Sequence, residues 1–264
     1  MKKLFATLCL CLLIIQNIHA FVLPHIKEQT LLSIGIKVWA NESGNSIAGL
    51  TSWNKGEKFA SMGIGHFLWS PSYGTNDKSQ SFAVLIHYQE NQGITPPSWL
   101  QGNRVPPCPW KTRIAFLRAQ NSPRMRELRQ YLANTIASQS KFMLYRLQQS
   151  IQHMLQTAND HDRHYLENNL QYLSSTPLGL YVLIDYVNFK GLGLKNYRQT
   201  HYGWGLMSVL LNMRNAKGTL NTLQAFTWSA DKLLTDRANR SINPYDRKWL
   251  IGWRSRLQTY LASP

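Results

Sequence analysis

Two carboxylates and a glycine-rich turn lie close together near the beginning of this chain. Glu42 and Glu57 belong to the segment 38–69, which also contains the turn sequence SMGIGH at 61–66. Two carboxylates that face each other across a cleft can cleave a glycosidic bond, one as the proton donor and the other as a base or nucleophile. The segment is therefore a candidate site for acid–base chemistry.

A helix is predicted directly before Glu42. Leu31, Ile34 and Val38 repeat at helical spacing, so residues 27–41 are expected to form a helix with one apolar stripe. Glu42 continues that stripe, where a carboxylate is costly unless it borders a cleft. Partial burial would raise its pKa, as a general acid near neutral pH requires. The alternative is that Glu42 begins a solvated loop and caps a neighbouring element.

After Glu42 the composition changes to that of turns and short strands. Glycines are mixed with Ser, Asn and β-forming residues, so two or three short strands are predicted between about 46 and 69. Such strands beside the helix would form one wall of a cleft. Trp53, Phe67 and Trp69 are candidate faces for stacking sugars, although for each of them singly packing of the hairpin onto the helices is the favoured interpretation.

These motifs resemble the lysozyme-like superfamily, namely the phage-type lysozymes and, more loosely, the lytic transglycosylases and chitosanases. The segment 61–66 is similar to the Thr-x-Gly-x-Gly-His pattern of the phage-type branch, with Ser in place of Thr. Glu42-Ser43-Gly44 also resembles the start of the transglycosylase signature. The resemblance implies a helical fold with a small β-region, Glu42 as the catalytic acid, and Ser61 as a hydroxyl beside the attacking water.

The chain departs from the phage-type pattern in two respects. The interval from Glu42 to Ser61 is longer, and Glu57 is the only other carboxylate within it. If Glu57 faces Glu42, hydrolysis with two carboxylates is expected. If it points away, Glu42 acts alone and the substrate's own hydroxyl closes an anhydro-sugar, as the likeness to transglycosylases implies. The resemblance is confined to the segment 38–69.

The beginning of the chain has the features of a secretory signal. Lys2 and Lys3 precede an apolar run at 4–15, which is too short for a comfortable membrane span, and Ala20 is a suitable cleavage residue. The mature protein is therefore expected to begin at Phe21, to be periplasmic or secreted, and to have no stable membrane insertion. An uncleaved membrane anchor is the alternative.

The composition favours a globular protein with an anionic partner. The 264 residues carry a formal net charge of +16, and 44% of them are hydrophobic. A basic exported protein suits cell-wall polymer, anionic lipid or nucleic acid, but no nucleic-acid-binding motif is present. Peptidoglycan, with its peptide carboxylates, meets the requirement. No metal or organic cofactor is implied.

Cys108 would be the single cysteine left after cleavage, so the core must supply the stability without an internal disulfide. A cysteine hydrolase is one alternative, because a Cys at a helix N-terminus can have a lowered pKa. His66 would then be its base. The flanking residues Pro107 and Pro109 favour instead a small apolar plug, and Pro109 suits the first turn of a helix.

The most apolar predicted helix begins after Thr176 and ends at Gly191, and it should be the buried central helix. Asp185 and Asn188 share one face of it. An Asp in such a helix needs a partner or a function. One interpretation is a structural ion pair with Lys190 or Arg198; the other places Asp185 and Asn188 on the floor of a cleft, facing Glu42.

Further helices are expected near 82–91, after Ser122-Pro123, and near 219–236 and 244–261. The glycines beside Trp204 predict a tight turn that lets a ligand or a backbone approach closely. His161 and His164 are three residues apart, but a solvated turn explains them better than a metal site.

The sequence thus predicts a mainly α fold with a small β-hairpin region, a lysozyme-like α+β fold, in one domain over 21–264. The expected function is an exported glycosidase or lytic transglycosylase acting on peptidoglycan or a related amino-sugar polymer; the alternative is a non-catalytic wall-binding protein on the same scaffold. The candidate catalytic residues are Glu42, Glu57 and Ser61, and the candidate substrate-binding residues are His66, Trp53, Asp185, Asn188 and Trp204.

Overall fold

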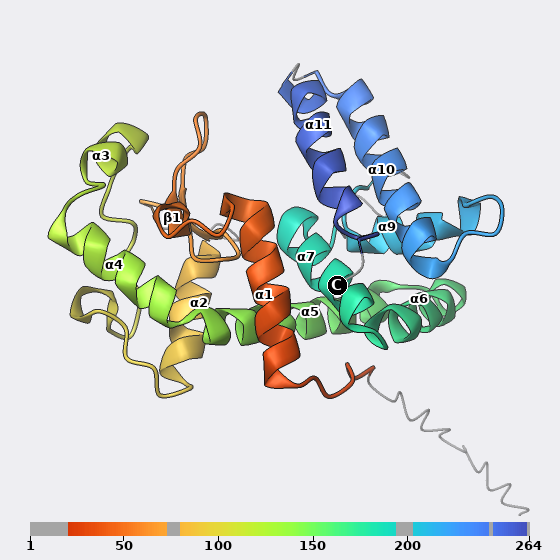
Figure 1. Ribbon diagram of the computed structural model, residues 1–264, viewed down its shortest axis with the longest axis horizontal. Coiled ribbons are helices and arrows are strands. Elements are labelled where there is room, and N and C mark those ends of the chain that lie inside the picture. The colour runs from red at the N-terminus through yellow and green to blue at the C-terminus, as the bar shows by residue number, and fades with distance from the viewer. Residues whose placement is uncertain (1–20, 73–79, 194–202, 243–244, 263–264) are drawn as a thin grey trace, which may run out of the picture.

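A computed structural model describes residues 21–72, 80–193, 203–242 and 245–262. The predicted signal at 1–20 and Arg198 lie outside these ranges. The fold class is confirmed: the chain is mainly helical and carries one three-stranded antiparallel sheet (Figure 1). In the part of the chain that is described, no helix combines the length and apolarity needed to cross a membrane.

The first helix, α1 (Glu28–Ser43), is the one predicted from the apolar stripe, and Leu31, Ile34 and Val38 are buried. It extends two residues beyond the predicted end and stops at Gly44, which has a left-handed backbone with φ 59°. Its amide donates to the carbonyl of Ala40 (2.9 Å), as is common at helix ends. Glu42 therefore lies in the last helical turn rather than in a loop.

Three short strands follow as predicted: β1 (Thr51–Ser52), β2 (Ala60–Met62) and β3 (Phe67–Trp69), in that order in the sheet. The turn 63–66 joins β2 to β3. Gly63 has φ 71°, and a Cβ on it would lie 2.2 Å from the side-chain oxygen of Gln139. That oxygen accepts the amide of Ile64 (2.9 Å), so the turn is fixed against the helix that carries Gln139.

The remaining helices lie close to the predicted ranges. Ser122 caps its helix through the Met125 amide as expected, whereas the helix expected to begin at Pro109 begins at Arg113 and is capped by Thr112. The bounds are α2 (Ser81–Glu90), α3 (Arg113–Arg118), α4 (Pro123–Asn134), α5 (Ile136–Thr157), α6 (Asp160–Ser174), α7 (Pro177–Lys190), α9 (Leu206–Asn212), α10 (Thr222–Arg240) and α11 (Tyr245–Gln258), with single 3-10 turns at Ala48–Leu50, Ser98–Leu100 and Met213–Asn215.

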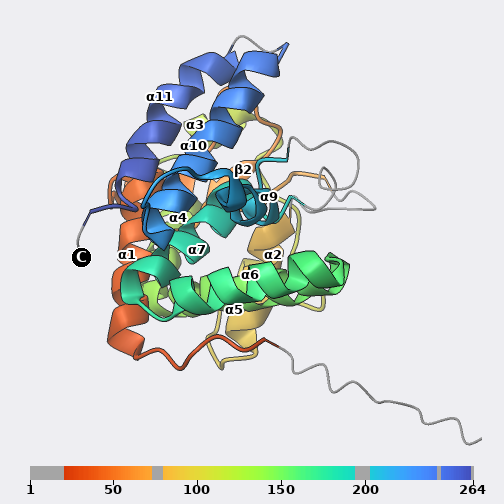
Figure 2. The same ribbon diagram turned by 90° about the vertical axis from the view of Figure 1, so that its right-hand side faces the viewer.

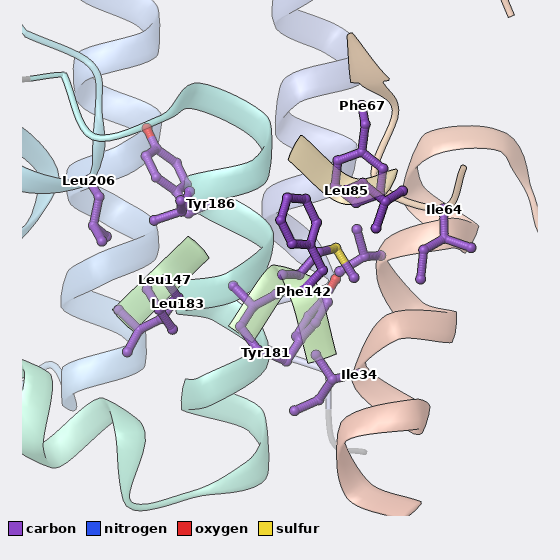
Figure 3. Packing of buried hydrophobic residues seen from close by; sticks show 14 of the residues in the cluster. Ile34, Ile64, Phe67, Leu85, Phe142, Leu147, Tyr181, Leu183, Tyr186 and Leu206 are labelled. Atoms are coloured by element: carbon purple, nitrogen blue, oxygen red, sulfur yellow. The ribbon is translucent and has the colours of Figure 1, made fainter. Parts of the chain in front are cut away.

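The helix α7 is the buried centre of the fold, as predicted. Residues 179–187 are all buried, and α1, α5, α6 and α9 pack around the helix (Figure 2). In Figure 3, side chains of α7 enter the apolar cluster between Ile34 of α1 on one side and Leu206 of α9 on the other. A helix covered on several faces must be apolar nearly all round, and the polar exceptions on α7 need partners.

The last two helices, α10 and α11, pack against each other as a hairpin that extends from the body in both views (Figures 1 and 2). The C-terminal end of α11 returns to the body, where Leu257 and Tyr260 are buried. Tyr181 of α7 packs edge-to-face on Tyr260, with ring centroids 5.8 Å apart. This contact brings the end of α11 against the same face of α7 that carries Asp185.

Candidate active site

Glu42 is the centre of a polar cluster built by four separate elements. Its Oε1 accepts hydrogen bonds from Arg256 of α11 (2.8 Å) and Asn188 of α7 (3.2 Å). Its Oε2 lies 3.3 Å from Nδ1 of His66, at the end of the turn 63–66. The Glu42 side chain remains 14% exposed, so part of it borders the solvent.

Asn188 holds the glycine-rich turn against Glu42. Its side-chain amide also donates to the carbonyl of Gly65 (3.0 Å), and a Cβ on Gly65 would lie 2.7 Å from the Phe67 ring. His66 has φ 47°, a conformation that costs energy for a residue other than glycine and is concentrated at functional sites. Its Nε2 is buried and has no hydrogen-bond partner within the described ranges.

Asp185 is fully buried and forms a bidentate ion pair with Arg256, both contacts being 2.7 Å. The Tyr260 hydroxyl donates to the same carboxylate (2.6 Å), and Asn41 donates to it at 3.2 Å. The predicted structural ion pair thus exists, but its cation is Arg256 rather than Lys190, and Arg198 lies outside the described residues. Lys190 lies over the rings of Phe189 and Trp253. Within the described residues, Arg256 links Asp185 to Glu42, because it donates hydrogen bonds to both carboxylates.

The charge state of Glu42 differs from the prediction. Burial raises its pKa, but the positive charge of Arg256 and the hydrogen bonds from His66 and Arg256 outweigh burial and lower the pKa from 4.5 to about 2. The expectation of a raised pKa was therefore wrong. Its premise of partial burial was correct, but the prediction did not include a cation delivered from the last helix. In the free protein Glu42 is a carboxylate at neutral pH.

The lowered pKa of Glu42 predicts a defined pH dependence of stability. Because the folded pKa lies below 4.5, the stabilisation is fully present above that value and is lost as the pH falls toward about 2. We compare the free energies of unfolding of the parent and of Glu42→Gln. The excess stability of the parent should be near zero at about pH 2. It should rise to about 3 kcal/mol above pH 4.5. Urea unfolding of both proteins across this range measures it, and a difference independent of pH would contradict the ion-pair assignment.

Glu57 lies away from the cluster. It belongs to the loop between β1 and β2, where its backbone carbonyl accepts the indole N–H of Trp53 (2.8 Å). Its Oε2 is buried and unpartnered among the residues that the structure describes. This loop and the turn that touches Glu42 lie at opposite ends of β2, and a three-residue strand is roughly 10 Å long. The placement favours chemistry in which Glu42 acts without Glu57.

Ser61 occupies the middle strand, where it pairs with Ser52 and Leu68 and is 4% exposed. Its neighbours in β2, Ala60 and Met62, are fully buried, and successive side chains on a strand point to opposite faces. In the described parts of the chain no hydrogen bond joins Ser61 to Glu42. Of the motif 61–66, it is the histidine, and not the serine, that contacts the carboxylate.

Neither Trp53 nor Trp204, two of the predicted substrate-binding residues, is in contact with Glu42. Trp53 is 5% exposed, and its ring packs edge-to-face on Phe116, so it belongs to the core and offers no open face. Trp204 is half-buried beside Trp253 and Arg237. Its carbonyl accepts the Tyr186 hydroxyl (2.7 Å). This hydrogen bond fixes Trp204 to Tyr186 of α7, and Trp204 takes no part in the contacts of Glu42.

Two functional candidates, Arg256 and Arg146, were missed in the sequence. Arg256 is spaced three residues after Trp253 and four before Tyr260, so it lies on an apolar stripe, the same signal that marked Asp185. Arg146 of α5 donates to the side-chain oxygen of Asn188 (3.4 Å).

Cys108 does not have the properties of a nucleophile. It is fully buried, and burial raises its pKa to about 12. It also precedes α3 by five positions, so it is not at a helix N-terminus. These observations support the interpretation as an apolar plug.

Comparisons of the chain with protein-family models, with curated proteins and with solved structures gave no match. The geometry of the cluster around Glu42 is therefore the basis on which a function is assigned.

Proposed function

We propose that this protein cleaves an amino-sugar polymer of the cell wall, peptidoglycan or a related glycan, with Glu42 as the group that exchanges a proton with the glycosidic oxygen. One observation carries the proposal. The end of α1, the turn ending in His66, and Asn188 converge on the carboxylate of Glu42, whose side chain is partly exposed to solvent. The likeness of the segments 42–44 and 61–66 to lysozyme-like enzymes supports the same assignment.

The proton on Glu42 must be acquired when the polymer binds, since the free carboxylate is ionised. A sugar chain over the site removes the remaining water, and desolvation is already the largest single influence on this pKa. Arg256 keeps a carboxylate partner in Asp185 when Glu42 becomes neutral. His66, 3.3 Å from Oε2, is placed to share the proton.

Bond cleavage then follows in two steps. Glu42 gives its proton to the leaving oxygen as the bond from that oxygen to the sugar carbon breaks, and positive charge develops at the carbon. A hydroxyl of the same sugar, or a water molecule, attacks the carbon and returns its proton to Glu42. The position of Glu57 favours the internal hydroxyl and an anhydro-sugar product, because no second carboxylate is in contact with Glu42 within the described ranges.

Replacing Glu57 with glutamine is expected to leave the rate of cleavage close to that of the parent, with anhydro-sugar ends among the products. The physical reason is the location of Glu57 at the far end of β2. Mass spectrometry of products from purified cell walls measures both quantities. A large loss of rate, with hydrolysed ends in the parent's products, would assign Glu57 to the chemistry instead.

A wall-binding protein without catalytic activity is the second candidate. The ion pair between Glu42 and Arg256 favours it, because a permanently ionised carboxylate accepts hydrogen bonds from sugar hydroxyls but delivers no proton. Zymography of the protein on purified cell walls separates the two candidates. Binding to walls without clearing would support the second.

A further inference from the structure

Among the residues that the structure describes, Arg146 is a cation without an anionic partner. It projects from α5 and is half-buried, and burial alone lowers its pKa. In the portion of the chain that the structure describes, its one hydrogen bond goes to the side-chain oxygen of Asn188, at 3.4 Å. Its other neighbours are the rings of Phe67 and Phe142 (5.9 and 6.0 Å to the guanidinium carbon). A guanidinium has five N–H donors, so most of its capacity is unused.

Two other arginines that are buried or half-buried have more partners than Arg146. Arg256 is neutralised by two carboxylates. Arg129 has no carboxylate partner within the described ranges, but it donates to Thr51 (2.8 Å) and to both the backbone and the side chain of Gln120. Desolvating a charge without an ion pair or a full set of hydrogen bonds is costly. Of these three arginines, Arg146 alone has neither an ion pair nor more than one hydrogen bond within the described residues.

Its location connects this cation to the candidate active site. Asn188 donates to Oε1 of Glu42 through its amide nitrogen and accepts from Arg146 through its amide oxygen. Arg146 is thus two hydrogen bonds from the carboxylate proposed to act on the glycosidic oxygen. A polymer seated at Glu42 would bring the substituents of a neighbouring sugar within reach of the guanidinium.

We propose that Arg146 is a carboxylate-binding subsite, which makes the site at Glu42 selective for amino-sugar polymers with acidic substituents over neutral ones of the same backbone. The inference rests on the proposed function for the position of the polymer. The planar guanidinium matches a carboxylate with two parallel hydrogen bonds. A carboxylate bound there also adds negative charge beside Glu42, which favours uptake of the proton that Glu42 must deliver.

The test uses one pair of substrates: peptidoglycan oligosaccharides with free carboxyl groups, and the same oligosaccharides after conversion of those groups to methyl amides. The full-length mature protein is expected to show a kcat/KM about tenfold or more higher on the acidic form. In Arg146→Gln the ratio should fall close to one, with most of the loss on the acidic form. In Arg118→Gln, an exposed position on α3, the ratio should be that of the parent.

Thermal melting separates this role from a structural one. Arg146→Gln removes a cation that has no anionic partner in the described part of the chain, so the melting temperature of the variant should not fall below that of the parent. Arg146→Lys keeps the charge but not the paired geometry, so it should restore part of the ratio. The proposal would be overturned if the ratio of kcat/KM on the acidic and amidated substrates is near one in the parent, or if it is unchanged in Arg146→Gln. It would also be overturned if Arg146→Gln loses activity equally on both substrates and has a lowered melting temperature.

A failure of the catalytic proposal would be distinguishable. If neither oligosaccharide is cleaved, calorimetric binding of the same pair carries the test. Preference for the acidic form that is lost in Arg146→Gln would support the subsite even without catalysis, and equal binding of both forms would refute it.

Discussion

Replacing Glu42 with glutamine is expected to lower the rate of glycan cleavage by about 10²–10⁴-fold. The amide has nearly the same shape but cannot deliver a proton to the leaving oxygen. Some stability is also lost, because the ionised form of Glu42 is the favoured one in the folded protein. Arg256 keeps its pair with Asp185, so the variant should remain folded, and rates must be measured below its melting temperature.

The matched control for Glu42→Gln is Glu28→Gln. Glu28 lies in the first turn of the same helix, where its exposed carboxylate pairs with Lys141 on the surface. Exposed ion pairs contribute little, so this variant should cleave at the parent rate. Circular dichroism checks that both variants are folded. If Glu42→Gln retains full activity, the assignment of Glu42 as the proton donor is incorrect.

Replacing Asp185 with alanine is expected to lower the free energy of unfolding by about 3 kcal/mol or more. The change removes the bidentate partner of Arg256 and the acceptor of the Tyr260 hydroxyl, in a position that is fully buried. Removing one member of a buried pair leaves the other charge without adequate compensation. For a domain of this size the melting temperature should fall by about 6–12 °C.

Asp231→Ala is the control that isolates burial as the cause. Asp231 pairs with Arg254 at the same 2.7 Å distance, but about half of each side chain is exposed. Its replacement should cost less than about 1 kcal/mol. Calorimetric melting of the two variants gives the comparison directly. Equal effects of the two substitutions would mean that Asp185 is not held in a buried ion pair.

Local patterns in the sequence were sufficient for the fold class and for most element boundaries. The stripe of Leu31, Ile34 and Val38 predicted α1, and Ser122 and Thr176 begin α4 and α7 with the side-chain caps expected of them. These signals work because a helical stripe or a cap involves residues within a few positions of one another. Pro109 misled the prediction of α3, since a proline fits a first turn without requiring one.

The candidate site was predicted in its parts but not in its assembly. Glu42, His66 and Asn188 were each named from the sequence, and the structure brings them into contact. Glu57 and Trp53 were named by the same kind of reasoning and lie elsewhere. Residue type and spacing along the chain identify side chains that could take part in catalysis, but they do not show which of these side chains come into contact in the fold.

By itself, the sequence determined that a carboxylate ends an amphipathic helix beside a glycine-rich turn. Only the tertiary structure decided its charge. The pKa of Glu42 is lowered because Arg256, 214 positions away, reaches its Oε1 at 2.8 Å. That approach depends on how α11 packs against α7, where Tyr260 and Arg256 meet Asp185. Electrostatic interactions depend on distance in space. A sequence pattern that places a carboxylate at the end of a helix therefore does not determine its pKa, which depends on charges that the fold brings close to it.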